Sequence, residues 1–565
     1  MTMRRPALAM LLMALASPVT GALAAGADSA LKAQDAAAAL VRGDTGQAVL
    51  GYTEALKDTS LSNDRRATIL TDRAVAYARL GQTKLAIDDF NRAAQLFPEY
   101  APIYNNRGSL LLALGYPEEA IKDFNRAIVL APGYAAALGN RAGAYAQVGH
   151  NEQAIRDYTR AVRLLPQAAA PLAGRGRVHL AVGRPYSAIR DFTRAVTADP
   201  RFAAAYRSRA EANLNIGHQQ DAIEDLSRAI AFDVGNGELY LLRGHAYLST
   251  GNPAAAFKDF SHVVEVDPQS ARGYAARGLA SGLAQSYEDA FADLNRAIEL
   301  DPRFGPAFAY RAVVYKLTGQ ADVGVKDAET ALKLDPDGAE ALWAKAEIEE
   351  AQGRTNEAVA DYKRALAAKP ELKLAADGLQ RLGGDLGDSE DREIPGLGVA
   401  GWRVVERGQR YFAVNDQYRR LRVPLEMAGE GQPRLLEWEM RKPPLSGIGT
   451  LRFAGGVVPG RVGPEEVEQV AIIDLANNTV VAIEPHRQGK QVSKWDWRDD
   501  RVVIASVDGA SDEYMLRASR TRGGRYTTSE NGVWSPWGQL DASQYEERPR
   551  RRHKPKTIFQ FLFGN

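Results

Sequence analysis

Residues 101–134 read APIYNNRGSLLLALGYPEEAIKDFNRAIVLAPGY, and the pattern of this stretch recurs along the chain every 34 residues. Gly115 is followed by Ala120, then by Phe124, and Pro132 closes the stretch. Alanine and the ring lie four residues apart on one helix face, so the small side chain admits a neighbouring helix while the ring fills the gap. Glycine permits a turn and proline ends a helix. The stretch therefore predicts two helices joined by a turn.

The same period covers more than half of the chain. A divergent first unit occupies residues 30–66, nine regular units occupy residues 67–372, and residues 373–382 are expected to form a capping helix. Helices of about a dozen residues are marginal alone in water, so each unit must be stabilised by stacking on its neighbours. The sequence thus predicts an α-solenoid of about ten helix–turn–helix units. The regular units start at Ala67, Ala101, Ala135, Ala169, Ala203, Gly237, Ala271, Gly305 and Ala339.

The period and its glycine, alanine, aromatic and proline positions resemble the tetratricopeptide repeat. This resemblance implies a concave surface, lined by first-helix positions, along which a peptide or protein partner binds. An idle surface on a passive spacer is the alternative. The cation-and-amide set that clamps a C-terminal carboxylate in some relatives is not assembled here. The partner-binding residues that the resemblance implies are Asn105, Asn106, Asn140, Arg177, Arg207, Glu211 and His245.

Two units depart from the pattern. Gln285 stands where the other regular units carry the turn glycine, and Gly324 and Ala328 stand where the alanine and the large apolar side chain belong. A missing ring removes packed volume from a core. We therefore expect looser packing in the unit that starts at Gly305.

Charged residues keep the same period. An arginine such as Arg107 precedes an aspartate such as Asp123 by 16 residues in unit after unit, with Lys345 closing the series. This spacing predicts ion pairs between the two helices of a unit, and a charged track for a ligand is the alternative. Exposed pairs contribute only about 0 to 1 kcal/mol each, so we expect them to set register more than stability.

The helical period ends after residue 382. Residues 383–401 are rich in Gly, Asp, Glu and Ser, which predicts a linker. Short β-type runs separated by turn signals fill residues 402–545 and predict a smaller, mainly-β region, a compact antiparallel sandwich or barrel. Trp495 and Trp497 share one strand face, which indicates core packing or, alternatively, a stacking platform for a glycan or peptide.

The two ends of the chain have their own patterns. Residues 1–25 combine Arg4 and Arg5, a short apolar run and a small-residue cleavage box, which predicts a signal peptide and a periplasmic or secreted product. No later run is long enough to span a membrane after cleavage. Residues 546–565 are basic and then aromatic, which indicates a disordered end or a weak contact with an anionic membrane surface or a partner.

Composition restricts the function. The 565 residues carry a net charge of +1 and no Cys, which argues against nucleic acid as the main partner and removes thiol chemistry. No catalytic or phosphate-binding motif is assembled, so we expect no cofactor, no metal and no catalytic residue. The sequence favours a non-catalytic interaction scaffold in the cell envelope. The alternative is a cell-wall-associated enzyme whose activity resides in the β-rich region, with the repeats as a docking arm.

Overall fold

The computed structural model describes residues 27–369, 372–384, 392–399, 401–407, 410–418, 421–427, 431–440, 448–459, 464–475, 479–486, 495–498, 501–505 and 511–515. The described chain divides into two compact units between Val178 and His179, within helix α10. The predicted signal peptide (residues 1–25) and basic tail (546–565) lie outside the described residues. Among the described helices, none is both long and apolar enough to cross a membrane.

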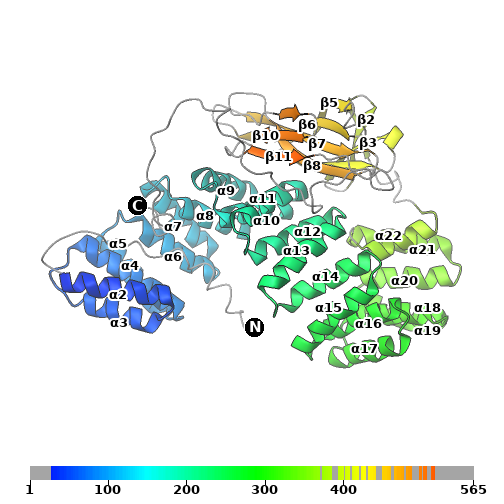
Figure 1. The fold of residues 1–565 in the computed structure, drawn as a ribbon, viewed down its shortest axis with the longest axis horizontal. Coiled ribbons are helices and arrows are strands. Elements are labelled where there is room, and N and C mark those ends of the chain that lie inside the picture. The colour runs from blue at the N-terminus through cyan, green and yellow to red at the C-terminus, as the bar shows by residue number, and fades with distance from the viewer. Residues whose placement is uncertain are drawn as a thin grey trace. The chain divides into compact units, whose positions relative to one another are not determined.

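Paired helices make up both units up to residue 381, which confirms the predicted solenoid (Figure 1). Each regular pair has a first helix of 13 residues, or 17 in α4, and a second of 14. The first unit contains α2 (Ala27–Arg42), α3 (Thr45–Ala55), α4 (Asn63–Arg79), α5 (Thr83–Leu96), α6 (Ala101–Ala113), α7 (Pro117–Leu130), α8 (Ala135–Gln147), α9 (Asn151–Leu164) and most of α10 (Ala169–Ala181). The second contains α11 (Pro185–Ala198), α12 (Ala203–Asn215), α13 (Gln219–Phe232), α14 (Gly237–Ser249), α15 (Pro253–Val266), α16 (Ala271–Leu283), α17 (Tyr287–Leu300), α18 (Gly305–Leu317), α19 (Ala321–Leu334), α20 (Ala339–Ala351), α21 (Thr355–Ala368) and α22 (Lys373–Arg381).

The turn between paired helices uses a left-handed residue. Gly115 has a φ of 86°, and the equivalent glycines of the other regular units also have positive φ. In the unit that starts at Ala271, the same position is Gln285, with a φ of 65°. Among the described residues, Gln285 is the only non-glycine with positive φ.

We expect Gln285→Gly to raise the free energy of unfolding by about 1 kcal/mol, because a Cβ in the left-handed region costs roughly 1–2 kcal/mol. Urea unfolding followed by circular dichroism measures the change. Gln320→Gly is the matched control, because Gln320 also lies in the turn between two paired helices, α18 and α19, but has a φ of −108°. Equal effects of the two substitutions would contradict this explanation.

The arginine and aspartate series forms the predicted ion pairs between the helices of each unit. Nε and Nη2 of Arg107 donate to the two carboxylate oxygens of Asp123, both at 2.7 Å, and Nη1 donates to Asn91 of the preceding unit at 2.8 Å. The pairs are not exposed as expected, because their aspartate side chains are only 3–12% exposed. Such pairs include Arg73–Asp89, Arg107–Asp123, Arg141–Asp157, Arg209–Asp225, Arg243–Asp259, Arg277–Asp293, Arg311–Asp327 and Lys345–Asp361.

The expectation of looser packing around Gly324 is wrong. A Cβ at Gly324 would lie 2.8 Å from Cδ1 of Ile348 and 2.9 Å from the main-chain oxygen of Ala312. The glycine therefore lets α19 approach its neighbours closely at this position.

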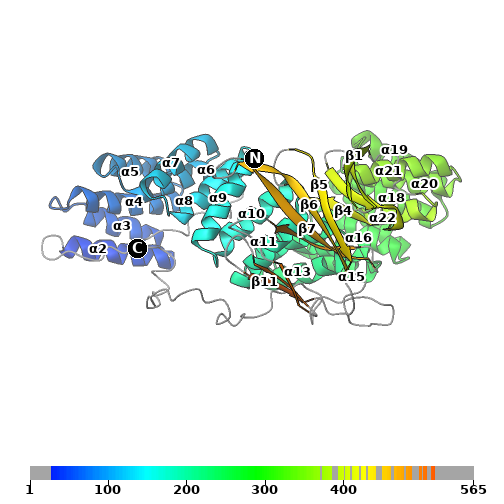
Figure 2. The same cartoon turned by 90° about the horizontal axis from the view of Figure 1, so that it is seen from above.

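Beyond the helices, the chain forms three antiparallel sheets, which confirms a smaller mainly-β region. Their strand orders are β1-β2-β3-β4, β5-β6-β7-β8 and β11-β10-β9. Strands β5, β6 and β7 run beside one another in Figure 2. The strands are β1 (Arg392–Val399), β2 (Trp402–Arg407), β3 (Arg410–Asn415), β4 (Arg422–Leu425), β5 (Arg434–Met440), β6 (Ile448–Pro459), β7 (Pro464–Asp474), β8 (Thr479–His486), β9 (Trp495–Arg498), β10 (Arg501–Ala505) and β11 (Ser511–Met515).

The expected linker over residues 383–401 must be corrected, because Arg392–Val399 form strand β1. This strand contains Pro395, Gly396 and Gly398, which favoured a linker in the sequence. Its pairing with β2 is interrupted between Ile394 and Val399, so these residues occupy an irregular part of the ladder. The β-type runs of the sequence lie at residues 402–406, 435–440, 467–473, 479–484, 492–497, 502–506 and 513–517, so strands β3, β4 and β6 were not predicted either.

The first two sheets share one apolar core, and a helix residue takes part in it. Buried side chains of both sheets, such as Val404 and Phe453, pack in one cluster that also contains Tyr186 of α11. Glu426, which follows β4, accepts hydrogen bonds from the Tyr186 main-chain N–H at 2.8 Å and the Ser187 hydroxyl at 2.6 Å. The sheets are therefore anchored to the start of α11.

Candidate functional site

A cavity of about 500 Å³ lies among the first helices of successive repeats in the second unit. Its walls come from α12, α14, α16, α18 and α20, and it is completed by Lys369 after α21 and by the start of α22. Figure 1 shows these helices following one another from α12 to α22. We call this cavity the α12–α22 pocket. Its volume is within the range of about 300–1,000 Å³ found for ligand sites.

Aromatic side chains from two neighbouring helices line one side of the α12–α22 pocket. The rings of Tyr310 on α18 and Trp343 on α20 meet edge to face, with centroids 6.4 Å apart. Trp343 is only 2% exposed, and its indole N–H has no hydrogen-bond acceptor among the described residues. Burial raises the pKa of Tyr310, so its hydroxyl stays neutral. Two rings therefore line the pocket, and one of them carries a buried donor without an acceptor among the described residues.

The remaining wall is largely aliphatic. Leu242 and Leu248 come from α14, Leu279 from α16, and Leu372 and Leu374 from the start of α22. Apolar walls of this kind favour an apolar group of a ligand, because its transfer from water contributes about 25 cal/mol per Å² buried.

Charged residues of the pocket have charged partners. Arg272 donates to Glu238 at 3.0 Å, and Lys369 donates to Glu340 at 2.8 Å. The first pair joins helices of two different repeats, whereas the second lies within the repeat that starts at Ala339. The paired charges therefore give the pocket polar edges without creating a demand for a strongly charged ligand.

His245 is the titratable ring of the pocket. Burial, together with the positive charges of Lys369 and Arg272, lowers its pKa to about 4, while Glu340 acts in the opposite direction. Its ring meets Phe260 edge to face with centroids 5.2 Å apart. His245 is therefore neutral at neutral pH and provides a ring and a hydrogen-bonding nitrogen, not a charge.

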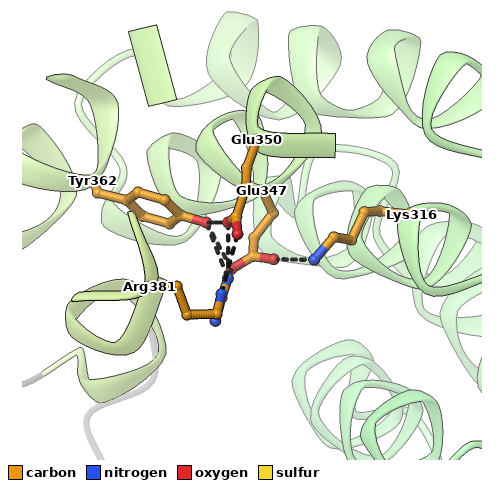
Figure 3. Close-up of polar contacts among 5 residues, drawn as sticks. All are labelled: Lys316, Glu347, Glu350, Tyr362 and Arg381. Atoms are coloured by element: carbon orange, nitrogen blue, oxygen red, sulfur yellow. Dashed lines mark hydrogen bonds and ion pairs between the residues drawn. The ribbon is translucent and has the colours of Figure 1, made fainter. Parts of the chain in front are cut away.

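A polar cluster lies at the C-terminal end of the same helices (Figure 3). Nη2 of Arg381 on α22 lies 2.8 Å from a carboxylate oxygen of each of Glu347 and Glu350 on α20. The Tyr362 hydroxyl of α21 is within hydrogen-bond distance of both carboxylates, at 2.8 and 2.6 Å. Lys316 of α18 donates to the other oxygen of Glu347 at 2.8 Å. We call these five residues the Arg381 cluster.

The residues predicted to bind a partner do not form one site. Glu211 and His245 line the α12–α22 pocket, and Arg207 donates to Glu211 at 2.9 Å. Three amides lie together in the first compact unit instead. Arg177 is exposed on α10 beside the Tyr158 hydroxyl. The amides are Asn105, Asn106 and Asn140.

The three side-chain amides of the first compact unit are hydrogen-bonded to one another. Asn140 donates to the side-chain oxygen of Asn105 at 2.9 Å, and Asn105 donates to that of Asn106 at 3.0 Å. Asn105 and Asn106 are 1% and 3% exposed. Their arrangement stabilises the contact between α6 and α8 and leaves little of either side chain for a ligand.

Sequence analysis did not identify the residues that provide the aromatic surface of the pocket, Trp343 and Tyr310. A signal for Trp343 was present, because it is the one tryptophan of the repeats and stands four repeats after Arg207, in the same position of the pattern. The pocket side of α22 had no such signal, since the period ends before it.

The β region leaves one prediction open. Trp495 and Trp497 lie on β9, where they pair in register with Ile504 and Val502 of β10. The stacking platform stays a prediction. Within the described residues, no three His, Asp or Glu side chains are grouped to hold a metal ion.

Comparison with known proteins identifies the repeat. Family models described as tetratricopeptide repeat match residues 67–100, 101–134, 173–236, 237–270 and 318–372. No curated protein matches the chain. Solved structures with a similar fold include a tetratricopeptide repeat protein from Parabacteroides merdae, which is 21% identical, with 43% of this chain and 98% of that chain covered and a TM-score of 0.38.

Two further solved structures are similar to parts of the array. MamA is 27% identical, with 28% of this chain and 95% of that chain covered and a TM-score of 0.28. YrrB, described as a TPR protein with an unusual peptide-binding site, is 20% identical, with 33% and 97% covered and a TM-score of 0.29.

Proposed function

Because this chain is a tetratricopeptide repeat protein, we propose that it is a non-catalytic scaffold that binds a peptide segment of a protein partner in the α12–α22 pocket. The observation that carries this proposal is Trp343, a buried ring at the pocket whose N–H has no acceptor among the described residues. A buried donor without an acceptor costs free energy, and a peptide carbonyl would satisfy it.

The chemistry of the pocket favours a segment with a large, uncharged apolar side chain. Tyr310 and Trp343 offer ring surface, the leucines offer aliphatic surface, and the charges at the edges are already paired. A charged group placed among them would lose its hydration without gaining an unpaired partner. An apolar anchor flanked by polar residues meets both the centre and the edges of the pocket.

The test is selection of binding peptides from a random phage-displayed library against the full chain, followed by affinity measurement on variants. We expect Trp343→Ala to weaken binding of the selected peptides by about 2 kcal/mol or more, roughly thirtyfold, as for other buried aromatic anchors. Trp343→Phe, which keeps a ring but not the N–H, should lose less.

Tyr116→Ala is the matched control for this measurement, because Tyr116 is an aromatic residue of the first unit that is 55% exposed. Peptides that bind the Trp343→Ala variant as tightly as the parent chain, with its circular dichroism unchanged, would refute the pocket as the binding site.

We also propose that the scaffold acts in the cell envelope. The pattern of residues 1–25 supports export, with cleavage after Ala24 or Ala25. The N-terminal sequence of the protein recovered from its native host tests this directly. A product that retains residues 1–25 in the cytoplasmic fraction would contradict it.

A further inference from the structure

The Arg381 cluster joins side chains of four elements. Lys316 belongs to α18, Glu347 and Glu350 to α20, Tyr362 to α21 and Arg381 to α22 (Figure 3). The two carboxylates are balanced by two cations, and Glu347 is only 7% exposed at its side chain. Removing Arg381 would leave two neighbouring carboxylates with Lys316 as their remaining cationic partner in the cluster.

The same four elements form one side of the α12–α22 pocket. Tyr310 comes from α18, Trp343 from α20, Lys369 from the residue after α21, and Leu372 and Leu374 from the start of α22. Trp343, Glu347 and Glu350 follow one another at helical spacing on α20, so one helix face carries both the pocket ring and the carboxylates. A displacement of α22 would therefore change the pocket and the cluster together.

Helix α22 depends on a few contacts. It has nine residues, which is too short for stable helix in isolation, and only Ala375, Gly378 and Leu379 are buried. Gly378 lies against the Tyr362 ring, where a Cβ would come within 2.3 Å of Cζ. Besides this close approach, the hydrogen bonds of Arg381 hold the end of the helix to α20.

We propose that Arg381 is a positioning residue for the α12–α22 pocket: it holds α22 in place, so that Leu372 and Leu374 complete the wall against which a bound peptide packs. This inference rests on the proposed function of the pocket. A ligand that contacts α22 and α20 together favours the docked helix, so peptide binding and docking of α22 stabilise each other.

The chain contains no cysteine, so Leu374→Cys gives a single thiol on the pocket side of α22. Leu374 is half-buried, so a change in the rate of reaction of this thiol with a maleimide reports a change in how often α22 leaves the pocket, and needs no ligand. In this background we expect Arg381→Ala to accelerate labelling about tenfold and to weaken the library-selected peptide by about the same factor, because only the docked fraction binds. Added peptide should slow labelling of the parent.

Three variants complete the experiment. Arg381→Lys, which keeps the charge without the planar fork, should restore part of both effects. Gly378→Ala should reproduce both effects without changing any charge, because it forces α22 away from Tyr362. Lys333→Ala, at an exposed cation of α19, is the matched control and should change neither measurement.

The outcomes separate this inference from the proposed function. If labelling of Arg381→Ala is unchanged, Arg381 does not hold α22, and if labelling accelerates while peptide affinity is unchanged, α22 is not a wall of the binding site. Either result overturns the inference. Failure of Trp343→Ala to weaken the peptide would instead refute the pocket itself, while the labelling rates would still report the role of Arg381.

Discussion

Replacing Arg209 by alanine is expected to lower the free energy of unfolding by about 3–5 kcal/mol, because the substitution leaves the other member of a buried ion pair, Asp225, without its partner. Nε and Nη2 of Arg209 donate to the carboxylate oxygens of Asp225 at 2.7 and 2.6 Å, and both side chains are 3% exposed. Nη1 also donates to Thr193 at 3.0 Å. Burial raises the pKa of Asp225 and Arg209 opposes this shift, so the carboxylate depends on the guanidinium.

Urea unfolding followed by circular dichroism measures this loss. Arg296→Ala is the matched control, because Arg296 and Glu299 form a 3.0 Å pair with side chains 45% and 65% exposed. That substitution should change stability by less than about 0.5 kcal/mol. Replacing Arg209 by Met together with Asp225 by Leu should recover most of the loss, since no charge remains buried. Equal effects of Arg209→Ala and Arg296→Ala would show that the periodic pairs contribute no more than surface pairs.

The partners of the periodic ion pairs could be predicted from the sequence, but their burial could not. A constant spacing of 16 residues places arginine and aspartate on facing helices whatever the rest of the chain does. Burial comes from neighbours in three dimensions: the Arg209 guanidinium lies over the Tyr206 ring, 5.7 Å from its centroid, and Thr193 covers it from the preceding unit. The repeat pattern does not show which residues will cover an ion pair.

The α12–α22 pocket could not be predicted by examining each repeat separately, for a related reason. Its lining residues extend from Glu211 to Leu374, and their approach depends on how the successive helices stack. Position in the repeat selected Glu211 and His245, which line the pocket, yet the same rule selected Asn105, whose polar groups are used inside the first compact unit. What distinguishes the two regions is the identity of the neighbouring side chains, which a period does not encode.

In the β region, some segments that contain glycine or proline form strands that the sequence analysis did not predict. Strand β6 contains Gly455 and Gly456, and its register with β7 shifts between Ala454 and Val457, at these glycines. A Cβ at Gly455 would lie 2.3 Å from Nε2 of Gln469, so glycine is needed for the strand to pass. The residues that indicated a break thus mark a bulge inside a continuous strand.

The attachment of the sheets to α11 is expected to weaken as the pH rises through about 7. Burial raises the pKa of Glu426 from 4.5 to about 7, although the hydrogen bonds from Ser187 and Tyr186 lower it in part. A carboxyl group with a raised pKa in the folded state contributes stability that is complete below about 4.5 and is lost as the pH rises through about 7. The loss amounts to about 3 kcal/mol if α11 and the sheets separate completely on unfolding.

Glu426→Gln should remove this pH dependence, because the amide is neutral at every pH and its oxygen can still accept from the Tyr186 N–H. Unfolding midpoints from about pH 5 to about pH 9 and hydrogen exchange of the Tyr186 amide, compared between the parent and Glu426→Gln at each pH, measure the effect. Glu393→Gln is the matched control, because Glu393 of β1 is a carboxylate with a 62% exposed side chain. A parent chain whose midpoint tracks that of Glu426→Gln at every pH would contradict the expectation.

The direction of this dependence follows from two opposing effects at the same carboxylate. Tyr186 and Ser187 stand in the first turn of α11, after Pro185, and the cap residue Arg184 forms no side-chain cap hydrogen bond. The positive end of the helix and the two donors favour the charged form of Glu426. Burial between the helix and the sheets disfavours it by more, and the charges of Arg190 and Arg184 offset only part of that cost. Arg190→Ala should therefore raise the pKa of Glu426 further and move the loss of stability to higher pH.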